Sequence, residues 1–148
     1  LELIDGAAEA IRLINRSGYL AVVVTNQPVI ARNLCSLDEL NTIHATLETL
    51  LGREGAYLNA IYYCPHHPDK GYPEERPEYK IVCECRKPKP GMLLRAAEEW
   101  NIDLSESYMI GDSERDIKAG DAAGVKRSIL INTNEENALL DAVNTIIQ

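Results

Sequence analysis

Cysteine and histidine residues cluster in one short part of this 148-residue chain, and their spacing limits how that part can fold. Cys64 and His66 are separated by one residue, as are Cys83 and Cys85, and sixteen residues lie between His66 and Cys83. Each pair can direct two ligands toward one point, which is the pattern of a tetrahedral zinc site. A metal with four protein ligands has no open position for water. We therefore predict a structural zinc ion that holds residues 64–87 as a closed loop.

Two other states of these cysteines are possible. They could be ordinary reduced thiols, or Cys83 and Cys85 could form a redox pair, but the equal spacing at both ends of the loop favours zinc. We expect His66 rather than His67 to bind the metal. Cys35 is left over as a core or loop residue, and free or metal-bound cysteines fit a reducing compartment better than a disulfide framework does.

Length and charge limit the class of protein. A chain of 148 residues fits one domain, so we predict a single domain over residues 1–148 and a monomer. The net charge of −8 argues against nucleic-acid or anionic membrane partners, although a local basic site could still bind an anionic substrate. No apolar run approaches the roughly 20 residues that span a bilayer, and no signal segment opens the chain. We expect a cytoplasmic protein.

Apolar runs typical of buried strands alternate with segments of helical periodicity. This alternation predicts an α/β fold, a doubly wound parallel sheet with helices on both faces, in which Trp100 is a core residue. The expected helices cover residues 5–18, capped by Asp5, then 36–51, 92–100, 113–123 and 139–147, and the expected strands cover residues 19–24, 59–63, 107–110 and 128–131.

Polar residues follow several of these strands at their carboxyl ends. In open parallel sheets ligands bind at that edge, so we expect Thr25, Cys64 and Asp112 to lie together there. Asp112 could bind a hard cation such as Mg²⁺, with Asp116 supporting the site without binding the metal directly. The alternative is that Asp112 only caps the helix that follows it.

Other residues near these strand ends could bind an anion. Thr25 and Asn26 offer a hydroxyl and an amide to phosphate oxygens, although a simple turn would use the same residues. Lys87 follows Cys85 by two positions, so the zinc loop could direct its ammonium group toward the same edge, where it would stabilise developing negative charge. Arg86 could bind a second anionic group through its planar guanidinium.

Together these motifs resemble one family. The segments Val24-Thr-Asn-Gln27, Tyr62-Tyr-Cys-Pro-His-His-Pro68, Cys83-Glu-Cys-Arg-Lys-Pro88 and Gly111-Asp112 with Asp116 occur in the order found in haloacid dehalogenase-type phosphatases, most closely the D-glycero-D-manno-heptose 1,7-bisphosphate phosphatases. The resemblance covers essentially the whole chain. It implies a Rossmann-like core without a large cap domain.

The resemblance also implies roles for individual residues. In this family an aspartate attacks phosphorus, a second aspartate two residues later is the general acid and base, and Mg²⁺ joins both to the phosphate. By resemblance, Thr25 and Lys87 hold the transferring phosphoryl group and Asp112 binds Mg²⁺. The residues expected to contact substrate are Asn26, Gln27, Arg86 and Ser113, and those matching the zinc ligands are Cys64, His66, Cys83 and Cys85.

One family segment does not occur in the sequence. The Asp-x-Asp motif that should end a strand ahead of the first helix is absent from the 148 residues. That strand lies at the centre of the family's sheet. Its removal would leave two half-sheets with unpaired backbone groups, and we expect the cost to exceed the roughly 5 to 15 kcal/mol that stabilises a typical domain. We therefore expect an N-terminally incomplete domain whose nucleophile and general acid lie upstream.

The function that follows is hydrolysis of a phosphomonoester with Mg²⁺. The expected substrate is a small phosphorylated sugar, with removal of the 7-phosphate of D-glycero-D-manno-heptose 1,7-bisphosphate. One alternative is a histidinol-phosphate phosphatase, because those enzymes share the zinc loop. An alternative of another class is a non-catalytic, zinc-stabilised module that binds a sugar phosphate.

Overall fold

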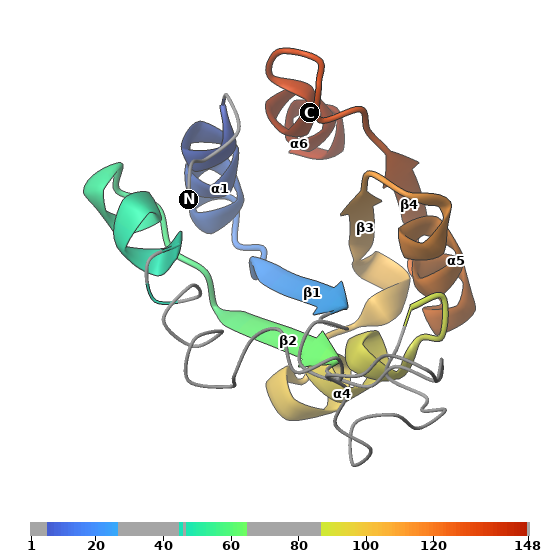
Figure 1. Cartoon of the computed structure of the whole chain (residues 1–148). Helices are drawn as coiled ribbons and strands as arrows, with labels where there is room; N and C mark the ends of the chain where they lie inside the picture. Colours follow the sequence, from blue (N-terminus) through green and yellow to red (C-terminus); the bar gives the residue numbers. More distant parts are fainter. Residues whose placement is uncertain (1–5, 27–44, 46, 65–86, 148) are drawn as a thin grey trace, which may run out of the picture.

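Helices and parallel strands alternate along the chain in the computed structural model, which describes residues 6–26, 45, 47–64 and 87–147 (Figure 1). Residues 47–53 are also helical. The other elements, in chain order, are α1 (Ala7–Arg16), β1 (Val22–Asn26), β2 (Ala60–Cys64), α4 (Gly91–Trp100), the short 3-10 helix η2 (Leu104–Glu106), β3 (Tyr108–Gly111), α5 (Glu114–Ala123), β4 (Arg127–Leu130) and α6 (Ala138–Ile147).

The strands form two parallel pairs. In the first pair, β1 lies beside β2 with a register that runs from Val22 opposite Ala60 to Asn26 opposite Cys64. In the second, Tyr108 at the start of β3 lies opposite Arg127 of β4. The α/β class and the parallel pairing are confirmed, and within the described residues the strands form two separate pairs, because β1 and β3 are not hydrogen-bonded to each other.

Two expectations about burial are wrong, one for Tyr19 and Leu20 at the start of the first strand and one for Trp100. The first strand begins at Val22 instead of Tyr19, and the side chains of Tyr19 and Leu20 are 39% and 42% exposed. The pairing of β1 with β2 starts at Val22 opposite Ala60. Just before it, the N–H of Ala21 donates to the side-chain oxygen of Asn59, and the C=O of Ala21 accepts from the N–H of Asn59. Trp100 is 41% exposed because it is the last residue of α4, where the chain turns away through the left-handed residue that follows.

The two ends of α5 follow ordinary capping rules, with a capping box at Ser113 and a glycine after the last turn. α5 ends at Gly124, whose positive φ of 87° is the conformation that glycine adopts without steric cost, as the sequence predicts. α1 differs from its prediction, because its N-cap is Gly6 and Asp5 lies outside the described residues. The expected start of the second helix at Ser36 lies outside them as well.

Helices cover the two strand pairs and form two core clusters. On one side, Met92 and Ala96 of α4 pack against Tyr62 of β2. On the other side, Ala119 of α5 packs with Met109 of β3 and with Leu93 of α4. α4 therefore contributes to both clusters, while α1 packs against α6 (Figure 1). Within the described part of the chain, no helix has the length and apolar character needed to cross a bilayer.

The contact between α5 and the β3–β4 pair is close enough to depend on a glycine. A Cβ atom at Gly120 would lie 2.7 Å from Cβ of Met109 and 2.5 Å from Oγ of Ser128. We expect Gly120→Ala to lower the free energy of unfolding by about 1 to 3 kcal/mol, because α5 must move away from the strands.

A helical glycine in open space provides the control. No atom lies within 4 Å of a Cβ placed at Gly52, so Gly52→Ala should raise the free energy of unfolding by up to about 1 kcal/mol. Urea unfolding followed by circular dichroism measures both values. Equal effects of the two substitutions would contradict the packing described here.

Candidate active site

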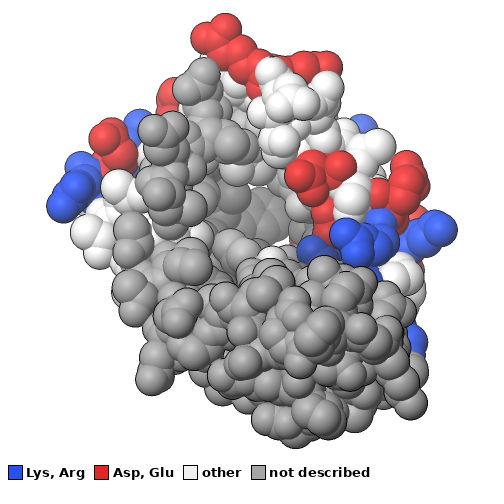
Figure 2. Space-filling view, in the orientation of Figure 1, with Lys and Arg blue, Asp and Glu red and all other residues white. Residues whose placement is uncertain are grey.

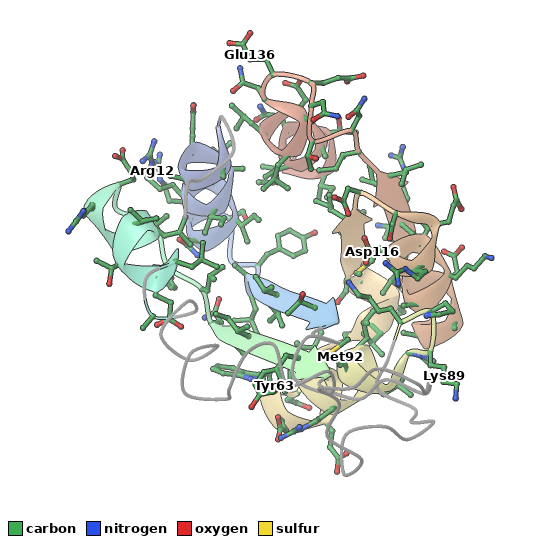
Figure 3. The ribbon with its side chains drawn as sticks, viewed as in Figure 1. Arg12, Tyr63, Lys89, Met92, Asp116 and Glu136 are labelled. Carbon is green, nitrogen blue, oxygen red and sulfur yellow. The ribbon has the colours of Figure 1, made fainter. Side chains whose placement is uncertain are left out.

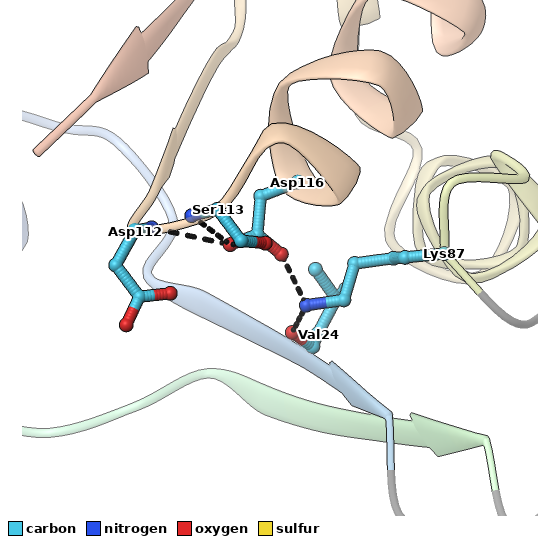
Figure 4. Close-up of polar contacts among 5 residues, drawn as sticks. All are labelled: Val24, Lys87, Asp112, Ser113 and Asp116. Atoms are coloured by element: carbon cyan, nitrogen blue, oxygen red, sulfur yellow. Dashed lines mark hydrogen bonds and ion pairs between the residues drawn. The ribbon is translucent and has the colours of Figure 1, made fainter.

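Lys87 connects the two strand pairs. Its Nζ atom lies 2.5 Å from Oδ1 of Asp116 near the start of α5 and donates a hydrogen bond of 3.1 Å to the backbone oxygen of Val24 in β1 (Figure 4). The side chains of Lys87 and Asp116 are only 12% and 8% exposed. The ammonium group is therefore held, largely out of water, between the carboxyl ends of β1 and β3.

The second oxygen of Asp116 anchors the turn between β3 and α5. Oδ2 accepts hydrogen bonds from the backbone N–H groups of Asp112 and Ser113, at 3.1 and 3.3 Å, and from the Ser113 hydroxyl at 3.1 Å. Burial alone would raise the pKa of Asp116, but the hydrogen bond and positive charge of Lys87, with the bonds from Ser113, lower the pKa below its ordinary value. The group is therefore a carboxylate, and its orientation is fixed by both of its oxygens.

Gly111 makes this arrangement possible. A Cβ atom at Gly111 would lie 2.3 Å from Cβ of Asp116 and 2.4 Å from its Oδ2 atom. Any larger residue would therefore displace the carboxylate that holds Lys87. The sequence carries a signal for this geometry, since Ser113 and Asp116 have the spacing of a capping box directly after a strand.

Asp112 lies at the carboxyl end of β3 with an exposed side chain, on the edge of a cavity of about 760 Å³ that also involves Asn132, Asp141 and Thr145. The capping alternative for this residue is not supported, because Ser113 is the N-cap of α5. One exposed carboxylate suits Mg²⁺, which binds through few protein ligands and keeps several waters. Among the described residues no group of three or more histidine, cysteine, aspartate or glutamate side chains could hold a metal.

The other predicted site residues are only partly described. Thr25 lies opposite Tyr63 at the carboxyl end of the first strand pair, and Asn26 lies opposite Cys64. Lys87 contacts Val24, the residue before Thr25, and Asp116, whose carboxylate accepts a hydrogen bond from the N–H of Asp112. The predicted gathering of Thr25, Cys64 and Asp112 at one edge stays a prediction. The remaining predicted residues lie outside the described part of the chain: Gln27, His66, Cys83, Cys85 and Arg86.

The sequence did not predict the pairing of Lys87 with Asp116. The two residues are 29 positions apart, and no local pattern relates them. Figure 3 shows Asp116 pointing toward the interior of the molecule, whereas Arg12 and Glu136 lie toward its outside. The available signal for a buried charge was the position of Asp116, four residues after Asp112, on the inner side of α5.

Removal of the Lys87 ammonium group should be costly. In Lys87→Met the buried carboxylate of Asp116 loses its counterion, so we expect the free energy of unfolding to fall by about 3 to 5 kcal/mol. The matched variant is Lys126→Met, which removes an exposed ion pair with Glu106 whose charged atoms lie 3.9 Å apart. Its free energy of unfolding should fall by less than about 1 kcal/mol. Urea unfolding at neutral pH measures both, and a Lys87→Met variant as stable as Lys126→Met would refute the role of the buried pair.

Comparisons with known proteins agree on one family. The HAD-hydrolase-like family model matches residues 84–144. The chain is 43% identical over 134 residues to the D-glycero-beta-D-manno-heptose-1,7-bisphosphate 7-phosphatase of Pasteurella multocida (strain Pm70), a match that covers 90% of this chain and 70% of that protein. The enzyme of the same name from Escherichia coli (strain K12) is 42% identical, with 90% and 68% covered.

A solved structure supports the same relationship. The D,D-heptose 1,7-bisphosphate phosphatase from B. bronchiseptica, complexed with magnesium and phosphate, superposes with a TM-score of 0.71 at 35% identity. The match covers 84% of this chain and 63% of that one, so the chain spans about two thirds of the length of its relatives. The fold, the strand-end residues and these identities show that the chain belongs to the haloacid dehalogenase-like phosphatases, phosphoric monoester hydrolases that include the heptose 1,7-bisphosphate phosphatases.

Proposed function

We propose that this chain forms the larger part of a Mg²⁺-dependent phosphatase that removes the 7-phosphate of D-glycero-D-manno-heptose 1,7-bisphosphate. The observation that carries the proposal is the position of Lys87, fixed by Val24 and Asp116 where the two strand pairs converge. Phosphoryl transfer depends on positively charged groups that are positioned before reaction. The proposed substrate is the one for which the relatives are named.

The chemistry needs an acceptor that these residues do not provide. We infer that the nucleophilic aspartate lies in a segment outside the 148 residues, because no Asp-x-Asp occurs within them. Its carboxylate oxygen would form a bond to phosphorus while the bond to the sugar oxygen breaks. A second aspartate of that segment would protonate the leaving oxygen, and water would then hydrolyse the aspartyl-phosphate.

Residues of this chain would bind and orient the phosphate. Lys87 and Thr25 would hold the phosphoryl oxygens, and Asp112 would bind Mg²⁺, which when present neutralises charge on those oxygens. Asp116 would keep Lys87 in place and would not bind the metal. The proposed substrate contacts are Asn26, Gln27, Arg86 and Ser113.

We also propose that zinc closes the loop over residues 64–87 through Cys64, His66, Cys83 and Cys85. The support is the ligand spacing, and Lys87, which follows Cys85 by two positions, marks the point where the loop returns to the strand ends. A closed site of this kind would position Arg86 and Lys87 without taking part in the reaction.

Phosphate release by the native gene product tests the proposed activity. We expect Mg²⁺-dependent release that is faster from D-glycero-D-manno-heptose 1,7-bisphosphate than from histidinol phosphate. Asp112→Asn should lower kcat/KM by about 10²-fold or more, because the metal loses its carboxylate. Asp141→Asn, which changes another exposed carboxylate of the same cavity, is the control and should leave kcat/KM unchanged.

Each other result contradicts part of this proposal. Faster release from histidinol phosphate would assign the alternative substrate. Binding of the sugar phosphate without turnover by the native product would replace the phosphatase with the non-catalytic binding module.

Metal content tests the zinc loop separately. We expect about one zinc ion per chain by elemental analysis. Cys85→Ser should remove most of it, whereas Cys35→Ser, which changes the cysteine outside the ligand pattern, should retain it. A zinc content that falls equally in both variants would contradict the assigned ligands.

A further inference from the structure

Tyr62 of β2 is connected to the last turn of α4 by polar contacts. Its hydroxyl donates a hydrogen bond of 2.5 Å to Oε1 of Glu99. The Nε atom of Arg95 lies 3.5 Å from Oε2 of the same carboxylate, and the guanidinium carbon of Arg95 lies 5.5 Å from the centroid of the Tyr62 ring. We call this group of three side chains the tyrosine clamp.

The tyrosine clamp is directional, whereas the packing around it is not. Tyr62 is 8% exposed and packs against Met92 and Ala96 of α4, and such apolar contacts tolerate some sliding of a helix along a strand. The hydrogen bond to Glu99 requires a short distance and a favourable angle. The pKa of Glu99 lies below its ordinary value, first because Tyr62 donates to it, so the acceptor is a carboxylate and the bond is charge-assisted. The clamp therefore fixes the position of α4 along β2.

Two routes connect Tyr62 with Lys87. In the ladder of β1 and β2, Tyr62 lies opposite Val24, whose backbone oxygen accepts the hydrogen bond from Lys87. Along the chain, α4 begins at Gly91, shortly after Lys87. Because a short helix moves as a rigid unit, a shift of α4 at Glu99 also moves its first turn. The contacts therefore form a closed circuit from Tyr62 through Val24 and Lys87 to α4 and back through Glu99.

Position distinguishes Lys87 from the other charges near this edge of the molecule. Acidic and basic side chains lie next to one another over α5 in the space-filling view, and that helix exposes Glu114, Arg115, Lys118 and Asp121 (Figure 2). The side chain of Lys87 is only 12% exposed. A group that stabilises charge in a transition state must be in place before reaction, and a displacement of about 1 Å can lower the rate by about 10²-fold. Contacts that fix the lysine therefore bear on activity even when they are distant from the phosphate.

We propose that the tyrosine clamp positions Lys87, because the hydrogen bond from Tyr62 to Glu99 keeps β2 and α4 in the register that places the ammonium group against Val24. Tyr62 and Glu99 act through Lys87 and are positioning residues. The effect on phosphate release rests on the proposed function, whereas the effect on the position of the lysine does not. The alternative is a clamp that adds only stability, whose loss would leave Lys87 and the rate of the folded enzyme unchanged.

Removal of one hydroxyl group tests the effect on the reaction. In the native gene product, Tyr62→Phe keeps the packed ring and removes the donor to Glu99. We expect kcat for release of the 7-phosphate to fall about tenfold and KM to change less than about twofold, because the transition state depends on the position of Lys87 more than the bound substrate does.

Variants of Glu99 test the same hydrogen bond from its other side. Glu99→Gln retains an acceptor oxygen and should keep kcat within about threefold of the parent value. Glu99→Leu should lower kcat as much as Tyr62→Phe does. The double variant with Tyr62→Phe should be no slower than either single variant, because both remove one interaction.

Tyr108 provides the matched control. It is the first residue of β3, at the end of that strand opposite to Lys87, and its ring centroid lies 5.9 Å from Nζ of Lys126. Tyr108→Phe thus removes the same hydroxyl group beside another charged side chain. We expect it to leave kcat unchanged.

The ammonium group of Lys87 can also be observed without substrate. In protein with isotopically labelled lysine, NMR measures how fast the Nζ protons of Lys87 exchange with water, and this rate reports the hydrogen bonds to Val24 and Asp116. We expect exchange at least about fivefold faster in Tyr62→Phe and unchanged in Tyr108→Phe, because only the first change loosens the support of the lysine.

The outcomes separate the possibilities. With an active parent enzyme, an unchanged kcat in Tyr62→Phe or an equal fall in Tyr108→Phe would overturn the proposal. A less stable Tyr62→Phe variant with unchanged exchange at Lys87 would also overturn it, since the clamp would then add only stability. If the native product releases no phosphate, the proposed function fails and the exchange measurement decides: faster exchange in Tyr62→Phe supports the clamp, and equal exchange overturns it.

Discussion

The ion pair between Lys87 and Asp116 is the contact on which the arrangement of the strand ends depends. The two strand pairs share no backbone ladder within the described residues, so they are connected by apolar packing through α4 and by this lysine. A buried ion pair loses much of its attraction to desolvation and is a poor means of adding stability. Its value here is positional, because it keeps a positive charge at the edge where a parallel sheet binds its ligands.

The position of that charge is determined by backbone geometry. Asp116 uses one oxygen for three donors in the turn after β3, which leaves the other oxygen for Lys87. The turn can close this tightly only because Gly111 has no side chain. A larger residue at Gly111 would therefore displace Lys87 indirectly, by moving the carboxylate of Asp116 that holds it.

Local patterns in the sequence predicted the described helices well, because caps such as Gly124 and the apolar periodicity of α4, α5 and α6 depend on nearby residues. Long-range features were less predictable. The contact of Lys87 with Asp116 spans 29 positions, and the exposure of Tyr19 and Leu20 depends on which distant elements pack against them. The zinc loop lies outside the described residues, so its ligand set remains a prediction from spacing.

Apolar packing and polar contacts contribute differently to the arrangement of the two strand pairs. α4 packs in both core clusters, but apolar burial is not directional and does not by itself determine how the strand ends face each other. The contacts of Lys87 with the backbone oxygen of Val24 and with Asp116 are directional, and they lie close to the strand end where Asp112 is exposed. Apolar packing therefore accounts for the association of the two pairs, whereas a few hydrogen bonds determine the geometry of the candidate site.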